Sequence, residues 1–285
     1  MLRQRVLTAL VLMALLLSTL VPSNPLPFAL FALVFCAVGM GEWARLAGYR
    51  RWGTLVAWGL LWAIVAGAVL LMLSRQAWEL PSGWTWFWSG CTALWLLLLA
   101  RTLPSARLPA GLRDGVVLAS LGFLLLLAAW LALVELRARG AVFMLSLLAL
   151  VWTADIAAYF GGRAWGRSKL APAISPGKTW AGAWTALGAV LVYSALCALS
   201  ARTAPSDFSP NYFAHLRDHL GWAGLLVAAV VLLCFAIAGD LFESVLKRAA
   251  GVKDSGRLLP GHGGVLDRID ALIPALPLAL LLLAL

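Results

Sequence analysis

The sequence has few charged residues for its length, and this scarcity excludes most soluble proteins. Only 12% of the 285 residues are Asp, Glu, Lys or Arg, whereas a soluble domain usually carries about 25%. Hydrophobic residues make up 63% of the chain, and its mean hydropathy is +0.93. We therefore expect an integral membrane protein, which places much of its surface against lipid.

The chain is also poor in cysteine. Its four cysteines, Cys36, Cys91, Cys197 and Cys234, are far apart and lie within apolar runs. They have none of the paired spacings that bind zinc or form redox motifs. A buried cysteine usually acts as a small hydrophobic residue, so we assign these four no chemical role.

Acidic residues are scarce as well, with 12 Asp and Glu against 22 Lys and Arg and a net charge of +10. In a soluble protein this balance would suggest a nucleic-acid partner. In a membrane protein the positive-inside rule and the attraction to anionic headgroups account for it. We therefore expect the lipid bilayer as the partner and no nucleic acid.

The apolar residues fall into nine segments, most of them near the length of about 20 residues that a helix needs to cross a bilayer. They are 5–21, 26–41, 53–73, 84–100, 115–134, 141–160, 180–201, 221–239 and 269–285. Arg3 and Arg5 before the first segment also suit a signal peptide, but no small-residue cleavage site follows. The predicted fold class is all-α, a polytopic membrane protein with about nine transmembrane helices.

The distribution of basic residues predicts how these helices cross the membrane. If the N-terminus is cytoplasmic, 17 of the 22 Lys and Arg residues face the cytoplasm, which favours an N-in, C-out topology. Residues 1–140 then hold about five spans, and residues 141–285 hold the others with two polar cytoplasmic segments, 155–182 and 240–270. A bacterial inner membrane fits this pattern. The largest outer loop, 202–220, contains His215 and His219 at helical spacing, and we interpret it as solvated rather than metal-binding.

The second polar segment begins with five polar residues at positions i, i+3, i+4, i+7 and i+8. A helix that continues from the eighth apolar segment places them on one face. Snorkelling at a helix end explains the basic residues but not the two carboxylates. The residues are Asp240, Glu243, Ser244, Lys247 and Arg248.

A glycine-rich stretch follows, in which Gly263 and Gly264 flank His262 and allow backbone amides to approach a phosphate. Asp267 and Asp270 come next, three residues apart, and share a face if a helix has begun. Two such carboxylates repel each other unless a cation lies between them, and a hard metal ion is the natural partner. Helix N-terminal caps are the alternative interpretation.

The first polar segment offers a short hydroxyl and ammonium loop before the seventh apolar segment. Ser175, Lys178 and Thr179 suit contacts with a phosphate, although a cap of the following helix by Ser175 or Thr179 is equally consistent. Asp155 lies inside the sixth apolar segment, where a carboxylate is costly, and is therefore a functional candidate.

Both segments resemble the phosphatidate cytidylyltransferases, also called CDP-diacylglycerol synthases. In the second, the matching residues are Ser244, Lys247, Arg248, Lys253, Asp254, Gly256, Leu259, Pro260, His262, Gly263, Gly264, Val265, Asp267, Arg268 and Asp270. In the first, they are Asp155, Ala158, Tyr159, Gly162, Arg163, Gly166, Arg167, Lys169, Leu170, Pro172, Ser175, Pro176, Lys178 and Thr179. The resemblance covers residues 150–270, and Ala181 departs from it where many relatives carry an acidic or amide residue.

The resemblance implies a transferase that joins CTP to phosphatidic acid and releases pyrophosphate. It implies that Mg²⁺ is bound by Asp267, with Asp240 and Asp270 as helpers, and it is compatible with a second cation. The implied catalytic residues are Asp240, Lys253, Asp254, His262, Asp267, Arg268 and Asp270. The implied substrate-binding residues are Ser175, Lys178, Thr179, Ser244, Lys247, Arg248, Gly263 and Gly264.

Other functions remain open from the sequence alone. A CTP-dependent transferase or kinase acting on another lipid acceptor would use similar residues. A transporter would explain the many spans and Asp155, but the inverted repeats typical of transporters are not evident. A homodimer is also compatible with the sequence.

Overall fold

The computed structural model describes residues 2–76, 78, 84–200, 211–258 and 263–285. All nine predicted apolar segments coincide with helices. The helices are α1 (Leu2–Leu20), α2 (Leu26–Leu46), α3 (Trp52–Arg75), α4 (Thr85–Thr102), α5 (Gly115–Ala138), α6 (Ala141–Trp165), α7 (Trp180–Ser200), α8 (Tyr212–Ala249), α9 (Leu266–Ile269) and α10 (Leu272–Leu282), with a 3-10 turn at Ala110–Leu112.

Six of these helices, α2, α3, α5, α6, α7 and α8, are long and apolar enough to cross a membrane. This agrees with the predicted class, an all-α integral membrane protein. The count of nine spans stays a prediction, because α10 has only 11 residues and the apolar part of α1 that the search covers is Leu10–Leu20.

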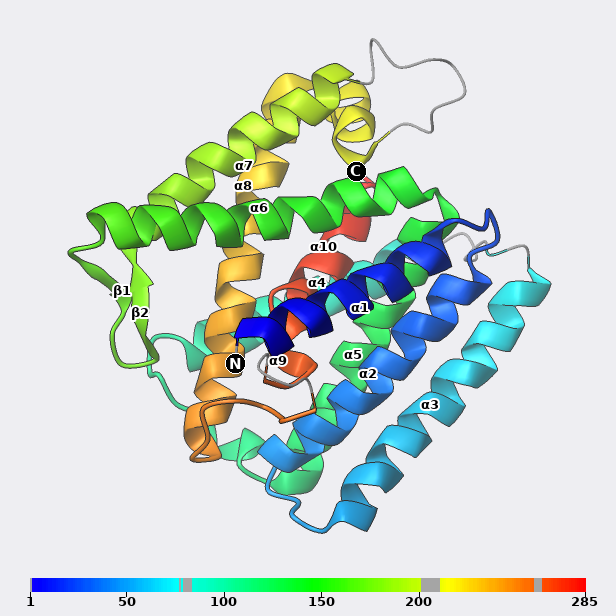
Figure 1. The fold of residues 1–285 in the computed structure, drawn as a ribbon, viewed down its shortest axis with the longest axis vertical. Helices are drawn as coiled ribbons and strands as arrows, with labels where there is room; N and C mark the ends of the chain where they lie inside the picture. The colour runs from blue at the N-terminus through cyan, green and yellow to red at the C-terminus, as the bar shows by residue number, and fades with distance from the viewer. Residues whose placement is uncertain (1, 77, 79–83, 201–210, 259–262) are drawn as a thin grey trace.

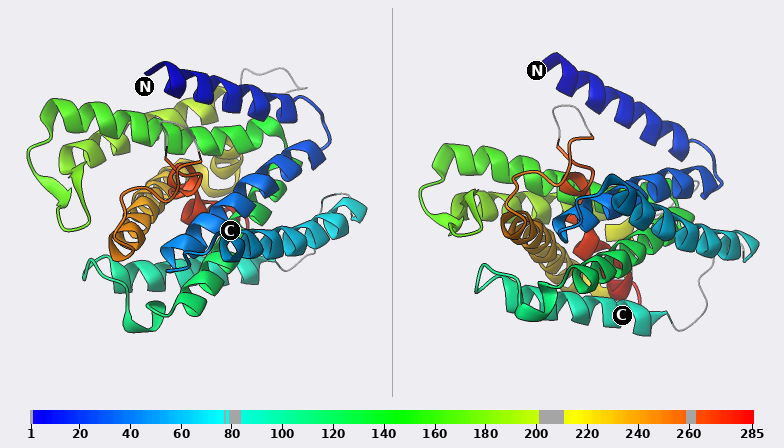
Figure 2. Two further views of the ribbon diagram at one scale, coloured as in Figure 1. Left: turned by 60° about the horizontal axis from the view of Figure 1, so that its bottom comes forward. Right: turned by 90° about the horizontal axis from the view of Figure 1, so that it is seen from below.

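The helices form one bundle around α10. Helix α10 packs against α4, α5 and α8, and every residue of Ile273–Leu280 is buried. Helices α2 and α3 lie side by side, as do α6 and α7, whereas α1 lies at the margin and contacts mainly α2 (Figures 1 and 2). The C-terminal apolar segment is therefore part of the protein core rather than a lipid-facing helix.

Trp43 joins three helices at the centre of the bundle. It is 1% exposed, its indole N–H donates to the Leu118 carbonyl of α5 at 2.8 Å, and its ring lies against Phe242 of α8. Gly122 of α5 allows this contact, because a Cβ atom at that position would lie 2.4 Å from the indole ring. A buried indole with a satisfied N–H is a strong packing anchor.

Two parts of the chain differ from the sequence-based prediction. Residues Lys169–Ala171 (β1) and Ser175–Thr179 (β2) form a small antiparallel hairpin between α6 and α7. Residues 212–220 are helical and not a solvated loop, so that prediction is wrong there; Asn211 caps α8 by accepting from the Ala214 amide at 2.9 Å. Tyr212, Phe213 and Leu216 are buried. The sequence analysis did not detect their helical spacing because polar residues lie between and after them.

The contact between Trp43 and Gly122 can be tested by adding one methyl group. Gly122→Ala overfills the space under the indole, and overpacking of this kind costs about 1–3 kcal/mol. We expect a lower Tm for the variant in detergent. Gly90→Ala on α4 is the matched control, because a Cβ there meets nothing within 4 Å; an equal loss of Tm in both variants would contradict this account.

Candidate functional site

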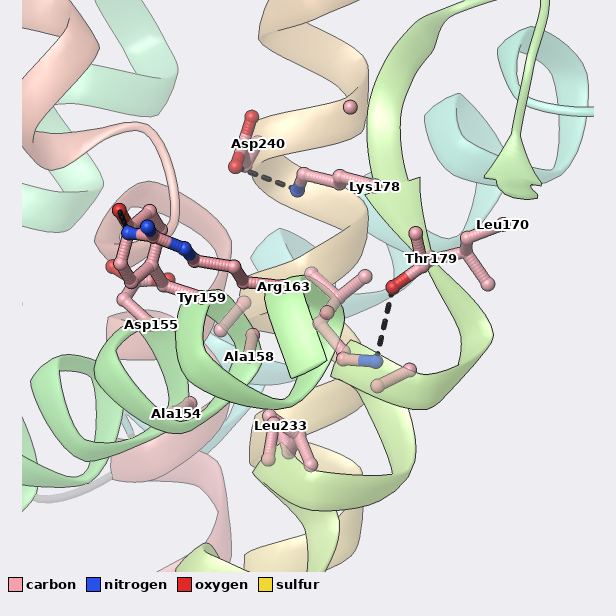
Figure 3. A pocket seen from close by; sticks show the side chains of 17 residues that line it. Ala154, Asp155, Ala158, Tyr159, Arg163, Leu170, Lys178, Thr179, Leu233 and Asp240 are labelled. Atoms are coloured by element: carbon pink, nitrogen blue, oxygen red, sulfur yellow. Dashed lines mark hydrogen bonds and ion pairs between the residues drawn. The ribbon is translucent and has the colours of Figure 1, made fainter. Parts of the chain in front are cut away.

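The two polar segments meet at a cavity of about 400 Å³ between α6, α7, α8 and the hairpin. Asp155 and Arg163 come from α6, Lys178 from β2 and Asp240 from α8, and all four line the cavity (Figure 3). The structure thus brings Asp155, Arg163 and Lys178 of the first polar segment close to Asp240, the first residue of the second. Ser175, which was predicted to belong with them, does not line this cavity.

An ion pair spans the cavity. The Lys178 ammonium lies 2.6 Å from Asp240 Oδ2, and both side chains are partly exposed, at 25% and 32%. The Ser244 hydroxyl donates to Asp240 Oδ1 over 3.5 Å. Asp155 interacts electrostatically with Asp240, Lys178 and Arg268. Acidic and basic groups of both segments are thus close enough to interact electrostatically, as a site for phosphates and cations requires.

The wall between α6 and α7 is made largely of backbone. A Cβ atom on Gly161 would lie 2.0 Å from the Thr185 hydroxyl, and one on Gly182 would lie 2.8 Å from the Ala158 carbonyl. The Thr185 hydroxyl donates to the Ala157 carbonyl at 3.0 Å. Thr179 ends the hairpin and caps α7, because its hydroxyl accepts from the Gly182 amide at 3.1 Å. The helix-cap interpretation of Thr179 is therefore confirmed.

Asp267 organises the glycine-rich loop. Its Oδ2 atom accepts from the Ser255 amide at 3.0 Å, the Ser255 hydroxyl at 3.1 Å and the Gly264 amide at 2.8 Å. Burial alone would raise the pKa of Asp267, but the hydrogen bond from Lys247 and those from the two amides outweigh it, so the pKa lies below its usual range. The loop amides thus converge on an anion, and that anion is the protein's own carboxylate.

Lys247 connects this loop to α8. Its ammonium donates to Asp267 Oδ1 at 2.7 Å and forms an ion pair with Glu243. Glu243 is only 2% exposed. Asp270 follows α9 and is close enough to Asp240 and Glu243 for their charges to interact. The predicted helical face of Asp240, Glu243, Ser244 and Lys247 is therefore present on α8.

Glu42 of α2 also contacts the glycine-rich loop, although the sequence analysis did not identify it. Its Oε2 atom accepts from the Ser255 hydroxyl at 3.0 Å and the Leu266 amide at 2.8 Å. A Cβ on Gly256 would lie 1.9 Å from Glu42 Oε1. A carboxylate at the end of an apolar segment is costly. This cost could have identified Glu42 as a functional candidate from the sequence.

The remaining predicted residues occupy other places. Lys253 and Asp254 are exposed on the loop after α8. Arg248 lines a different cavity from Asp240. Gly263 has φ +84°, which glycine adopts without strain. His262 lies outside the described residues.

The arrangement gives a limited set of donors for a metal ion. Among the described residues, no three His, Cys, Asp or Glu side chains gather closely enough to bind a metal alone. Mg²⁺ needs only one or two carboxylates when substrate oxygens and water complete its shell. Asp240 and Asp270 form such a pair, and their like charges favour a cation between them. The residues present therefore fit Mg²⁺ only together with a phosphate ligand.

Comparisons with known proteins agree with these motifs. Residues 3–285 match the model of the cytidylyltransferase family. A phosphatidate cytidylyltransferase of Pseudomonas aeruginosa is 38% identical over 281 residues, which cover 97% of this chain and 95% of that protein. Proteins of the same name from Haemophilus influenzae and Brucella suis are 34% and 39% identical over 97% and 87% of this chain, and over 96% and 81% of their own lengths.

The role of Glu42 in the loop predicts a local effect of its removal. Glu42→Ala leaves the buried Leu266 amide without its acceptor, at a cost of about 1–3 kcal/mol, and leaves Asp267 as the acceptor of the Ser255 hydroxyl. We expect hydrogen exchange of the Leu266 amide to become about tenfold faster or more. Glu135→Ala on α5 is the control, because it removes another buried carboxylate, one paired with Arg139. Unchanged exchange in Glu42→Ala would refute the role.

Proposed function

The chain belongs to the cytidylyltransferase family, and we propose that it transfers the cytidylyl group of CTP to phosphatidate, forming CDP-diacylglycerol and pyrophosphate. The similarity extends over nearly the whole chain. The observation that carries the proposal is the ion pair between Lys178 and Asp240 in a cavity lined by the first family motif and by α8, just before the second motif. It brings a phosphate-binding cation and a metal-binding carboxylate to one place.

In this reaction a phosphate oxygen of phosphatidate attacks the α-phosphorus of CTP. The bond from that phosphorus to the bridging oxygen of the β-phosphate breaks, and pyrophosphate takes the electron pair. Nucleophile and electrophile are both anionic, so catalysis rests on positioning and charge neutralisation. Lys178 and Arg163 line the cavity and are the cations that we assign to the phosphates, with Arg268 beside Asp155.

Mg²⁺ is the cation that we propose for the carboxylates. Asp240 and Asp270 supply oxygens for it, and Asp267 is a third ligand if Lys247 moves from its carboxylate to a phosphate. The metal would neutralise charge that develops on the phosphate oxygens. Two ammonium groups already balance Asp240 and Asp267, which supports a cation requirement at these side chains. A second cation is compatible with this set.

The membrane arrangement is part of the proposal. We infer nine spans with a cytoplasmic N-terminus, because 17 of the 22 basic residues then face the cytoplasm. The cavity lies at the end of α6, the start of α7 and residues 233–240 of α8, which this topology puts on that side. Residues 141–285 supply its lining, and the named relatives come from bacteria. A bacterial inner membrane with the site facing the cytoplasm follows from both.

The transfer can be measured as pyrophosphate release by purified protein in detergent with CTP, Mg²⁺ and phosphatidate. Asp240→Asn removes the partner of Lys178 and one metal oxygen, so we expect a loss in rate on the order of 100-fold. Asp218→Asn is the matched control, because Asp218 pairs with Arg217 at the far end of α8. Release without phosphatidate, or an unaffected Asp240→Asn variant, would contradict the proposed reaction or the proposed site.

The metal requirement has its own test. We expect a chelator to abolish pyrophosphate release and added Mg²⁺ to restore it, because the carboxylates otherwise repel the polyphosphate. Thermal stability with CTP is a second readout, since binding to the folded state raises Tm. We expect CTP to raise Tm more with Mg²⁺ than without it. Full activity in the chelator would remove the metal from the mechanism.

A further inference from the structure

A second cavity, of about 980 Å³, lies where the ends of α2, α4 and α8 meet the starts of α3 and α5. It shares no lining residue with the cavity at Asp240. Five arginines line it, and no Asp or Glu does. They are Arg45, Arg50, Arg107, Arg113 and Arg248. Within the described part of the chain, none of the five forms an ion pair with a carboxylate. Their guanidinium groups can therefore bind an anion from outside the protein.

This convergence exceeds what the positive-inside rule requires. That rule asks only that basic residues lie near the cytoplasmic helix ends. Arg51, just before α3, and Arg101, in the last turn of α4, satisfy it beside the same two connections and do not line the cavity. Arg50 and Arg107, by contrast, come from connections more than 50 residues apart and line the same space. Folding has therefore gathered charge at one place.

An apolar groove of about 590 Å³ between α2 and α3 adjoins this cavity. Its walls include Val34, Val38 and Leu60, and Val34 and Leu60 are 60% and 59% exposed. Arg45 and Leu55 line both spaces, so the groove and the arginine pocket are direct neighbours. A ligand that fills both carries phosphate at one end and a hydrocarbon chain at the other.

We propose that the pocket and the groove together bind an anionic phospholipid, with its headgroup phosphate among the five arginines and one acyl chain in the groove between α2 and α3. Arginine recognises phosphate through paired N–H donors, and basic pockets between membrane helices bind such headgroups. Gly256 and Arg257 of the glycine-rich loop also line the groove. The bound lipid thus touches that loop, and the site stands whether or not the proposed transfer is correct.

The test is binding of phosphatidylglycerol to the full chain in neutral detergent, followed by native mass spectrometry, with phosphatidylcholine as the uncharged comparison. We expect Arg50→Glu with Arg107→Glu to weaken phosphatidylglycerol binding at least about tenfold. Arg51→Glu with Arg101→Glu makes the same charge change beside the same connections, and we expect little effect. Equal losses in both pairs would show diffuse surface attraction and overturn the site.

A second arm tests the groove. Val34→Trp fills it, and we expect this variant to bind phosphatidylglycerol more weakly. Val192→Trp on α7 is the control, because Val192 is 61% exposed and lies outside the groove. Equal binding of phosphatidylcholine, or displacement of the lipid by CTP or pyrophosphate, would overturn the lipid assignment. The first result would leave the arginines without a role, and the second would make the pocket a nucleotide site.

Discussion

The carboxylate of Asp267 holds the glycine-rich loop together, since four donors from two parts of the chain converge on it. Lys247 reaches it from the last turns of α8, and Ser255 and Gly264 reach it from the loop itself. A serine hydroxyl has one proton to donate, and that of Ser255 lies between Asp267 and Glu42. A single buried anion thereby fixes the end of α8, the loop and the start of α9, and Glu42 joins this unit to the N-terminal half.

Two lysines of the site form ion pairs with its carboxylates. Asp240 has Lys178 as its partner, and Asp267 and Glu243 share Lys247. Binding of a divalent cation with a polyphosphate is then an exchange of partners, in which the carboxylates turn to the metal and the ammonium groups to the phosphates. Such an exchange leaves no charge unpaired in a region of low dielectric, where an unpaired charge is expensive.

Periodic features of the sequence predicted most of the fold. The apolar segments became helices, and the i, i+3, i+4 and i+7 spacing placed Asp240, Glu243, Ser244 and Lys247 on one face of α8. Contacts between distant segments could not be predicted in this way. Glu42 is 224 residues from Leu266, and no local pattern joins them. The hairpin at Ser175 was missed because its few residues carry weak periodicity, and Arg248 shares the spacing of Lys247 but turns toward a second cavity.

The backbone wall between α6 and α7 bears on how this protein can diverge. Gly161 and Gly182 leave no room for a side chain where the two helices meet. Substitutions at these two positions therefore cannot change the size or polarity of the cavity without separating the helices. Variation that adapts the cavity to a different lipid must fall at its other lining positions, on the hairpin, on α8 and on the cavity-facing sides of α6 and α7. A lineage that changes its acceptor would therefore carry its substitutions there and keep the seam of α6 and α7 unaltered.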